Sequence, residues 1–154
     1  MTGFKPLALS AAVLCGLAAA TLATAAPSAS ETIAARQANF KKIGGATKAI
    51  KDELGGSADK AKIAAAAKTI ATVARAQAKL FPSGTGPSSG VKTDALPAIW
   101  TQRATFDAAL GKLVAEADKL AAVARTGDAA AMGAQFRAVG GTCKSCHDQF
   151  RLDD

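Results

Sequence analysis

The chain has 154 residues and a mildly basic composition, with a formal net charge of +7 at pH 7. Its basic residues are scattered, aromatic residues make up only 5%, and tyrosine is absent, so no platform for stacking nucleic-acid bases is expected. These features argue against nucleic-acid binding and favour a surface that attracts an acidic partner protein.

The first 25 residues have the features of an export signal. Lys5 supplies a positive start, residues 7–22 form an apolar run, and residues 23–25 are small enough for a cleavage site. The run is short for a membrane span, which needs about 20 apolar residues. We therefore expect residues 1–25 to be a cleaved signal peptide and residues 26–154 to form one exported domain, without membrane insertion. Cleavage would leave 129 residues and a formal charge of +6.

The next part of the chain predicts two long helices. Alanine is abundant and no alternating β-branched run is present, so strands are not expected. The first helix is predicted from about Ser30 to Leu54, with a seven-residue apolar repeat that includes Phe40 and one charged member, Arg36. The second helix is predicted to begin after Ser57, as its N-cap, and to run to about Leu80.

Two further helices follow a long connection. Residues 82–96 are rich in glycine, serine and proline, a composition that does not sustain a helix. A third helix is predicted to begin near Pro97, and residues 126–128 predict a tight turn into a fourth. The fourth helix carries a buried face at spacings of four and three: Met132, Phe136, Val139, Cys143, Cys146 and Phe150. The predicted fold is all-α, an antiparallel four-helix bundle with one longer loop between the second and third helices.

Residues 143–147 read C-K-S-C-H, which has the C-x-x-C-H form of a c-type haem attachment sequence. At about 100° per residue, Cys143, Cys146 and His147 share one helix face, so two thioether bonds and an axial iron ligand can reach one haem. A structural zinc site needs four ligands, and Cys15 lies in the predicted signal peptide. A thioredoxin-like dithiol needs a βαβ setting, which the helical flanks lack. A plain disulfide remains an alternative.

The second axial position of such an iron has few candidates. His147 is the only histidine, and Met132 lies roughly 22 Å away along the same helix. Unless a lysine or the chain start intrudes, the iron is predicted to be five-coordinate. Phe40 is the leading candidate to face its open side, although ordinary core packing would explain Phe40 equally well. An inward-pointing Arg36 would need an anionic partner, such as a haem propionate.

Residues 36–40, 97–100 and 141–151 carry a resemblance that covers essentially the whole mature chain. The chain resembles the cytochromes c′, the class II c-type cytochromes with haem near the C-terminus. The resemblance implies one covalently attached haem c, held by Cys143 and Cys146 and ligated by His147. It also implies roles for residues around the haem: Arg36 and Gln37 in contact with it, Phe40 over the iron, Arg151 near the proximal face and Asp94 at the edge.

The resemblance further implies a function. Members of the family are periplasmic, commonly homodimers through their first helices, with high-spin iron that binds NO and often CO. We therefore expect a one-electron carrier, a gas-binding protein or both, with a redox partner that the sequence does not identify. An enzyme such as a peroxidase is disfavoured, because peroxidase chemistry needs a distal acid–base group. A low-spin electron carrier with a methionine ligand is a further alternative, against which Phe40 argues.

Overall fold

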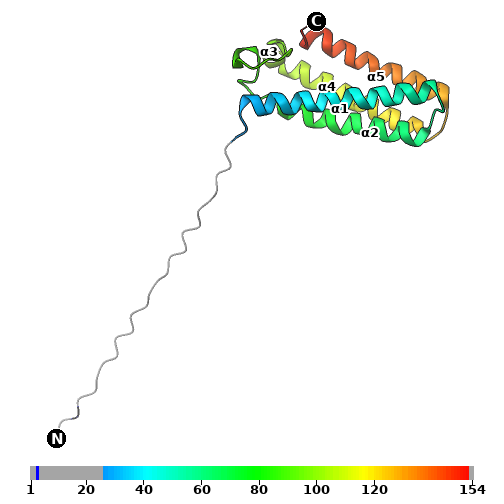
Figure 1. Ribbon diagram of the computed structural model, residues 1–154, viewed down its shortest axis with the longest axis horizontal. Helices are drawn as coiled ribbons and strands as arrows, with labels where there is room; N and C mark the ends of the chain where they lie inside the picture. Colours follow the sequence, from blue (N-terminus) through cyan, green and yellow to red (C-terminus); the bar gives the residue numbers. More distant parts are fainter. Residues whose placement is uncertain (1–2, 4–25, 153–154) are drawn as a thin grey trace.

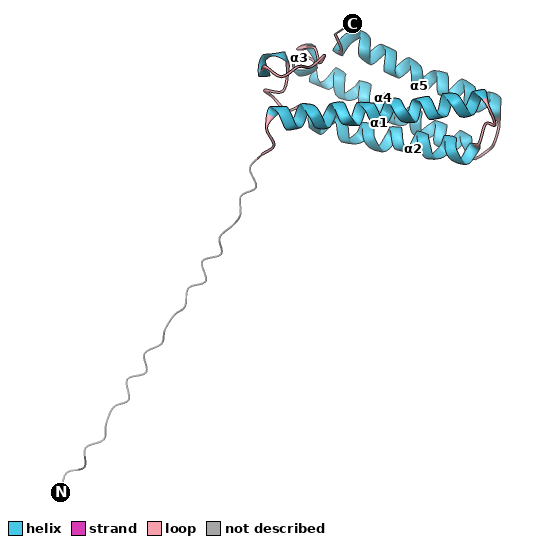
Figure 2. Cartoon of the chain, viewed as in Figure 1, coloured by secondary structure: helices cyan, strands magenta, loops and turns pink. Residues whose placement is uncertain are grey.

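The structure, a computed structural model, describes residue 3 and residues 26–152. All of the predicted signal peptide except Gly3 therefore lies outside the described residues. Four long helices form an antiparallel bundle, α1 (Ala29–Gly55), α2 (Lys60–Gln77), α4 (Arg103–Ala124) and α5 (Ala129–Phe150), and the described part contains no strand (Figures 1 and 2). The predicted fold class is confirmed. No helix in this part of the chain has the length and hydropathy needed to cross a bilayer.

The first helix begins at a capping box. The Glu31 amide donates to the Ser28 hydroxyl at 3.2 Å, and the Ser28 amide donates to the Glu31 carboxylate at 2.8 Å. Two amides near the helix start thus gain partners, which fixes the point where α1 begins.

The second helix is capped by a different residue from the one predicted. The Asp59 carboxylate accepts from the amides of Ala61 and Lys62 at 2.9 and 3.1 Å, so Asp59 is the N-cap. Ser57 instead donates its hydroxyl to the Glu53 carboxylate at 2.9 Å. The prediction of Ser57 as the N-cap was wrong because the Ser57 hydroxyl binds back to Glu53 of α1 and not to the start of α2.

The predicted third helix is divided in two. A single turn, α3 (Ala98–Thr101), follows Pro97, and the chain leaves helical geometry at Gln102 before α4 begins. The Arg103 guanidinium donates to the carbonyls of Phe81 and Ala78 at 3.0 and 2.7 Å. These carbonyls belong to the 3₁₀ turn η1 (Ala78–Leu80) and the residue that follows it. Arg103 therefore ties the start of α4 to the end of the preceding helix, because cationic donors satisfy C-terminal carbonyls.

The turn at residues 126–128 has the predicted form. Gly127 adopts a left-handed φ of 77°, which glycine reaches without steric cost. The Asp128 carboxylate accepts from the Ala131 amide at 3.0 Å and caps α5. This turn sends α5 back along α4, so that the chain segment 143–147 returns to the end of the bundle where α3 lies (Figure 1).

The core has two parts along the length of the bundle. The larger one is aliphatic and fills the middle and the end near the 126–128 turn, with Ile50, Ile70 and Leu120 fully buried. The smaller one, at the end near α3, is aromatic, and the ring of Phe106 lies 4.7 Å from that of Phe81 and 5.3 Å from that of Phe150.

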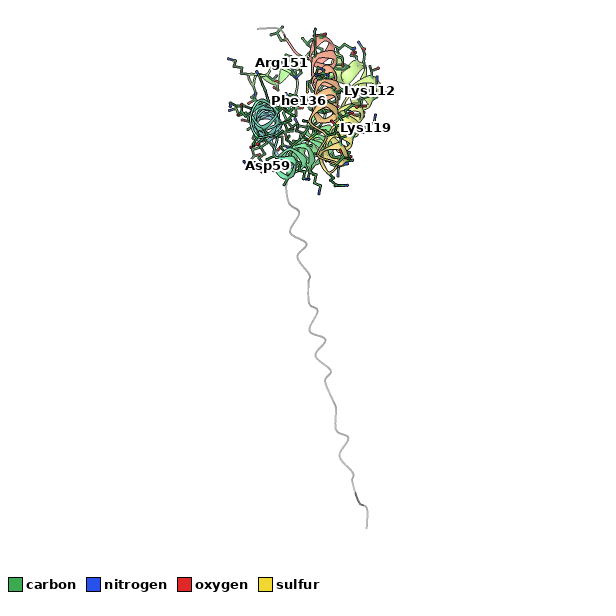
Figure 3. All side chains as sticks on the ribbon, turned by 90° about the vertical axis from the view of Figure 1, so that its right-hand side faces the viewer. Asp59, Lys112, Lys119, Phe136 and Arg151 are labelled. Atoms are coloured by element: carbon green, nitrogen blue, oxygen red, sulfur yellow. The ribbon has the colours of Figure 1, made fainter. Side chains whose placement is uncertain are left out.

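Among the four long helices, α1 and α5 pack against each other much less closely than α1 and α2, α2 and α4, or α4 and α5. They make few contacts with each other, whereas α2 packs along both α1 and α4. Figure 1 shows α5 diverging from α1 toward its C-terminal end. Figure 3 looks along the bundle, with Lys112 and Lys119 of α4 on the outside and Phe136 of α5 nearer the centre. The divergence leaves space between α1 and α5, and the cavity described below occupies it.

Candidate functional site

A cavity of about 660 Å³ lies between α1, α4, α5 and the loop before α3. Ligand sites in proteins typically enclose about 300–1,000 Å³ and are mainly apolar, and this cavity matches both criteria. Its apolar wall consists of Phe40, Ile43, Phe81, Ile99, Phe106, Ala109, Leu113 and Phe150. It is large enough and apolar enough to hold a flat organic cofactor.

The α5 wall presents Cys143, Cys146 and His147 together to this cavity. Both cysteines are free thiols and half-buried. Burial raises the pKa of the Cys143 and Cys146 thiols, and the neighbouring sulfur of Cys143 adds to the rise at Cys146. Partial desolvation, helped by the positive charge of Arg151, lowers the pKa of His147. The wall therefore offers two neutral thiols and a neutral imidazole, the form of histidine that binds metals.

The structure does not support the alternative interpretations of the C-x-x-C-H sequence. Cys143 and Cys146 are not joined by a disulfide. No group of three or more His, Cys, Asp or Glu side chains suited to a metal ion occurs among residues 26–152 and residue 3. The motif lies within α5, and the described chain has no strand with which to build a thioredoxin-like setting.

The opposite wall comes from α1. Phe40, Gly44 and Thr47 line the cavity at helical spacing, and the Phe40 side chain remains 37% exposed. The core rings of Phe81, Phe106 and Phe150 are only 2–3% exposed, so Phe40 differs from them, and its position over the iron stays a prediction. Gln37 also lines the cavity, and its amide nitrogen donates to the Lys92 carbonyl at 3.2 Å.

Arg36 lines the cavity and is almost completely buried, at 2% exposure. Its guanidinium donates to the Thr85 carbonyl at 2.8 Å, the Thr85 hydroxyl at 3.2 Å and the Thr93 hydroxyl at 2.7 Å. It also lies 4.6 Å from the centre of the Phe81 ring. Desolvation lowers the pKa of this guanidinium. Neutral oxygens and an aromatic face thus partner the Arg36 guanidinium, and its expected contact with a haem propionate stays a prediction.

The cavity edge is closed by a short pairing between the loop and the chain end. The Leu96 amide donates to the Phe150 carbonyl at 3.0 Å, and the Leu152 amide donates to the Asp94 carbonyl at 2.7 Å. These bonds bring Asp94 and Arg151 together at the cavity, with 3.9 Å between the carboxylate and the guanidinium. Arg151 appears at the top of Figure 3, at the C-terminal end of α5.

All the site residues predicted from the sequence line this one cavity: Arg36, Gln37, Phe40, Asp94, Cys143, Cys146, His147 and Arg151. The sequence reasoning missed Gly44 and Thr93, which also line the cavity, and Thr85, which holds the Arg36 guanidinium. Thr85 and Thr93 lie in a connection that looked irregular, and no local pattern connects them to Arg36. Gly44 lies inside the predicted first helix, and a glycine at such a position is only a weak sign that the residue has a packing or functional role.

Known proteins resemble this chain over most of its length. Residues 31–151 match the protein family described as Cytochrome C′. A cytochrome c′ of Rhodospirillum rubrum is 37% identical over 147 residues, which cover 92% of this chain and 95% of that protein.

Solved structures share the fold. A cytochrome c′ described as having an unusual ligand-controlled dimer dissociation aligns with a TM-score of 0.77 and 34% identity, over 84% of this chain and 100% of that chain. The nitric oxide complex of a mutant cytochrome c′ from Alcaligenes xylosoxidans aligns with a TM-score of 0.72 and 27% identity, over 82% of this chain and 97% of that chain. The chain therefore belongs to the cytochrome c′ family, whose cofactor is a covalently attached haem c.

Proposed function

We propose that the chain is a periplasmic haem protein whose iron has His147 as its only protein ligand, and which binds NO and CO, carries single electrons, or does both. The observation that carries this proposal is the cavity in which Cys143, Cys146 and His147 on α5 face Phe40 on α1. One wall offers groups that attach and ligate a haem, and the other offers an apolar ring.

Cys143 and Cys146 would hold the haem through two thioether bonds, one from each sulfur to one of its two vinyl groups. The haem supplies a redox-active, ligand-binding iron. Around it, Arg36 and Gln37 contact the haem from α1, Asp94 lies at its edge and Arg151 lies near its proximal face.

We infer that one side of the iron is open because the described cavity wall offers no second side chain able to bind it. Met132 is 1% exposed within the aliphatic core and is not among the residues that line the cavity. Lys41 lines the cavity and is exposed, but as an ammonium group it has no lone pair for the iron. Phe40 offers no hydrogen bond to bound O₂, whose complex with iron is polar, whereas NO needs none. The site therefore favours NO and CO over O₂.

The relatives support two parts of this proposal. The Alcaligenes xylosoxidans protein has been solved as a nitric oxide complex, and another relative is described as having a ligand-controlled dimer dissociation. We extend both properties to this chain and propose a homodimer formed through α1. The predicted export signal at residues 1–25 supports the periplasm as its location, and the formal charge of +6 on the cleaved chain supports an acidic redox partner.

Two alternatives make different predictions about the same iron. A peroxidase or an NO-converting enzyme would need an acid–base group above the iron, and Phe40 cannot serve as one, so we assign no enzymatic role. A low-spin electron carrier would need a sixth ligand, which the described cavity wall does not offer.

Optical spectra of the reduced protein, recorded alone and with CO or NO, test the proposed function. We expect a broad high-spin spectrum that each gas converts to a new form. A sharp low-spin spectrum that neither gas changes would overturn the open-site proposal and favour the electron carrier. Mass spectrometry of the same sample would show one haem on a chain that begins at Ala26 if the attachment and cleavage are as proposed.

A further inference from the structure

We propose that Gly44 forms the entrance through which diatomic gases reach the open side of the iron. The proposal rests on the proposed function, because it assumes a haem in the cavity with Phe40 over its iron. It assigns to Gly44 a role in the rate of gas entry rather than in holding the haem.

The position of Gly44 follows from the helical repeat of α1. Phe40 and Gly44 are four residues apart, so they lie one turn from each other on the same helix face, and both line the cavity. Gly44 is also exposed to solvent. Other lining residues of α1 are exposed as well, namely Gln37, Phe40 and Lys41, but each of them carries a side chain, whereas Gly44 has none.

The space beside Gly44 is open. A Cβ built on Gly44 would meet no atom within 4 Å apart from the backbone of its own helix. Gly86 shows the contrasting case, since a Cβ there would come within 3.0 Å of the Trp100 ring. Glycine at position 86 is needed for close packing, whereas at position 44 it leaves a gap.

The direction of helical side chains explains why this gap lies on the path to the iron. Each Cα–Cβ bond on a helix tilts toward the N-terminus, so a side chain covers the turn before its own Cα. A side chain at position 44 would lean over the turn that carries Phe40. Its absence leaves space along the α1 backbone on the Phe40 side of Gly44, and this space is the proposed path of the gas.

The replacement Gly44→Leu closes this path, and Gly45→Leu is its matched control. Gly45 lies on the same helix, is exposed, and also has no atom within 4 Å of an added Cβ, but it is not among the residues that line the cavity. Glycine is about 0.8–1 kcal/mol less favourable than alanine inside a helix and leucine ranks close to alanine, so neither replacement should impair folding. Thermal unfolding of both variants checks that α1 is intact.

The measurement is CO association and dissociation with the reduced protein, by flash photolysis and by displacement with NO. An obstructed entrance slows both directions by the same factor and leaves the affinity unchanged, because it raises a barrier without touching either end state. We expect about tenfold slower rates in Gly44→Leu, equivalent to about 1.4 kcal/mol of added barrier. Gly45→Leu should keep the rates of the unaltered protein, and both gas-free spectra should stay unchanged.

Three results would overturn this role of Gly44. The first is an unaltered association rate in Gly44→Leu, and the second is an equal slowing in Gly45→Leu. The third is a changed gas-free spectrum or a changed CO affinity in Gly44→Leu, which would mean that position 44 packs against the haem or the bound gas. Failure of the proposed function is distinct from all three, because the unaltered protein would then not bind CO.

Discussion

The replacement of Arg36 by methionine tests how the loop before α3 is held against the bundle. Methionine keeps much of the side-chain volume but removes the guanidinium, which donates to Thr93 and twice to Thr85. Hydrogen bonds from a charged donor contribute about 1.5–3 kcal/mol each. The contact between the guanidinium and the Phe81 ring adds about 1 kcal/mol.

Two effects offset part of this loss. Arg36 is only 2% exposed, so removing its charge recovers the desolvation cost of burying it. The threonines also keep partners, since the Thr85 hydroxyl donates to the Pro82 carbonyl at 2.8 Å and the Thr93 hydroxyl accepts from the Ala95 amide at 3.2 Å. We expect Arg36→Met to lower the free energy of unfolding by about 3 kcal/mol.

Urea denaturation of the haem-loaded protein, followed by circular dichroism, measures this loss. Arg75→Met is the matched control, because Arg75 pairs with Asp118 at the surface and both side chains are about half exposed. The control should lose less than about 1 kcal/mol. A loss of similar size in the two variants would refute the reasoning, because the hydrogen bonds of Arg36 would then contribute no more than a surface ion pair.

Two further predictions follow from the site and the helix ends. Phe40→Ala should speed CO binding to the reduced protein in flash photolysis, because the ring no longer covers the iron, and an unchanged rate would remove Phe40 from that position. Asp59→Ala should lower the free energy of unfolding by about 1 kcal/mol, since Asp59 caps α2. Ser57→Ala, measured by the same urea denaturation, should cost clearly less, and the reverse order would contradict the assignment of the cap.

The helices and the site could be predicted from the sequence because both depend on short-range spacing. The apolar repeats place the buried face of each long helix, and the C-x-x-C-H sequence contains the attachment groups and the ligand within five residues. The α2 cap illustrates the limit of such reasoning. Ser57 and Asp59 are both good N-cap residues, and only the bond between Ser57 and Glu53 decides between them.

The parts that could not be predicted depend on contacts between distant residues. Arg36 reaches Thr85 across 49 residues and Thr93 across 57, so nothing near Arg36 in the sequence identifies its neutral partners. The break between α3 and α4 likewise coincides with the bonds from Arg103 to the carbonyls after α2. The local sequence predicts one continuous helix from Pro97 onward. The structure instead has a break at Gln102, next to the hydrogen bonds that Arg103 makes with the end of the preceding helix.

The resonance Raman spectrum of the ferrous protein without added gas is the most direct test of a haem iron ligated only by His147. Its core-size bands report coordination number and spin state at once. We predict the bands of a five-coordinate, high-spin haem, because Met132 is buried in the aliphatic core and Phe40 faces the other side of the cavity. Bands of a six-coordinate, low-spin haem would contradict this, since a second protein group would then bind the iron.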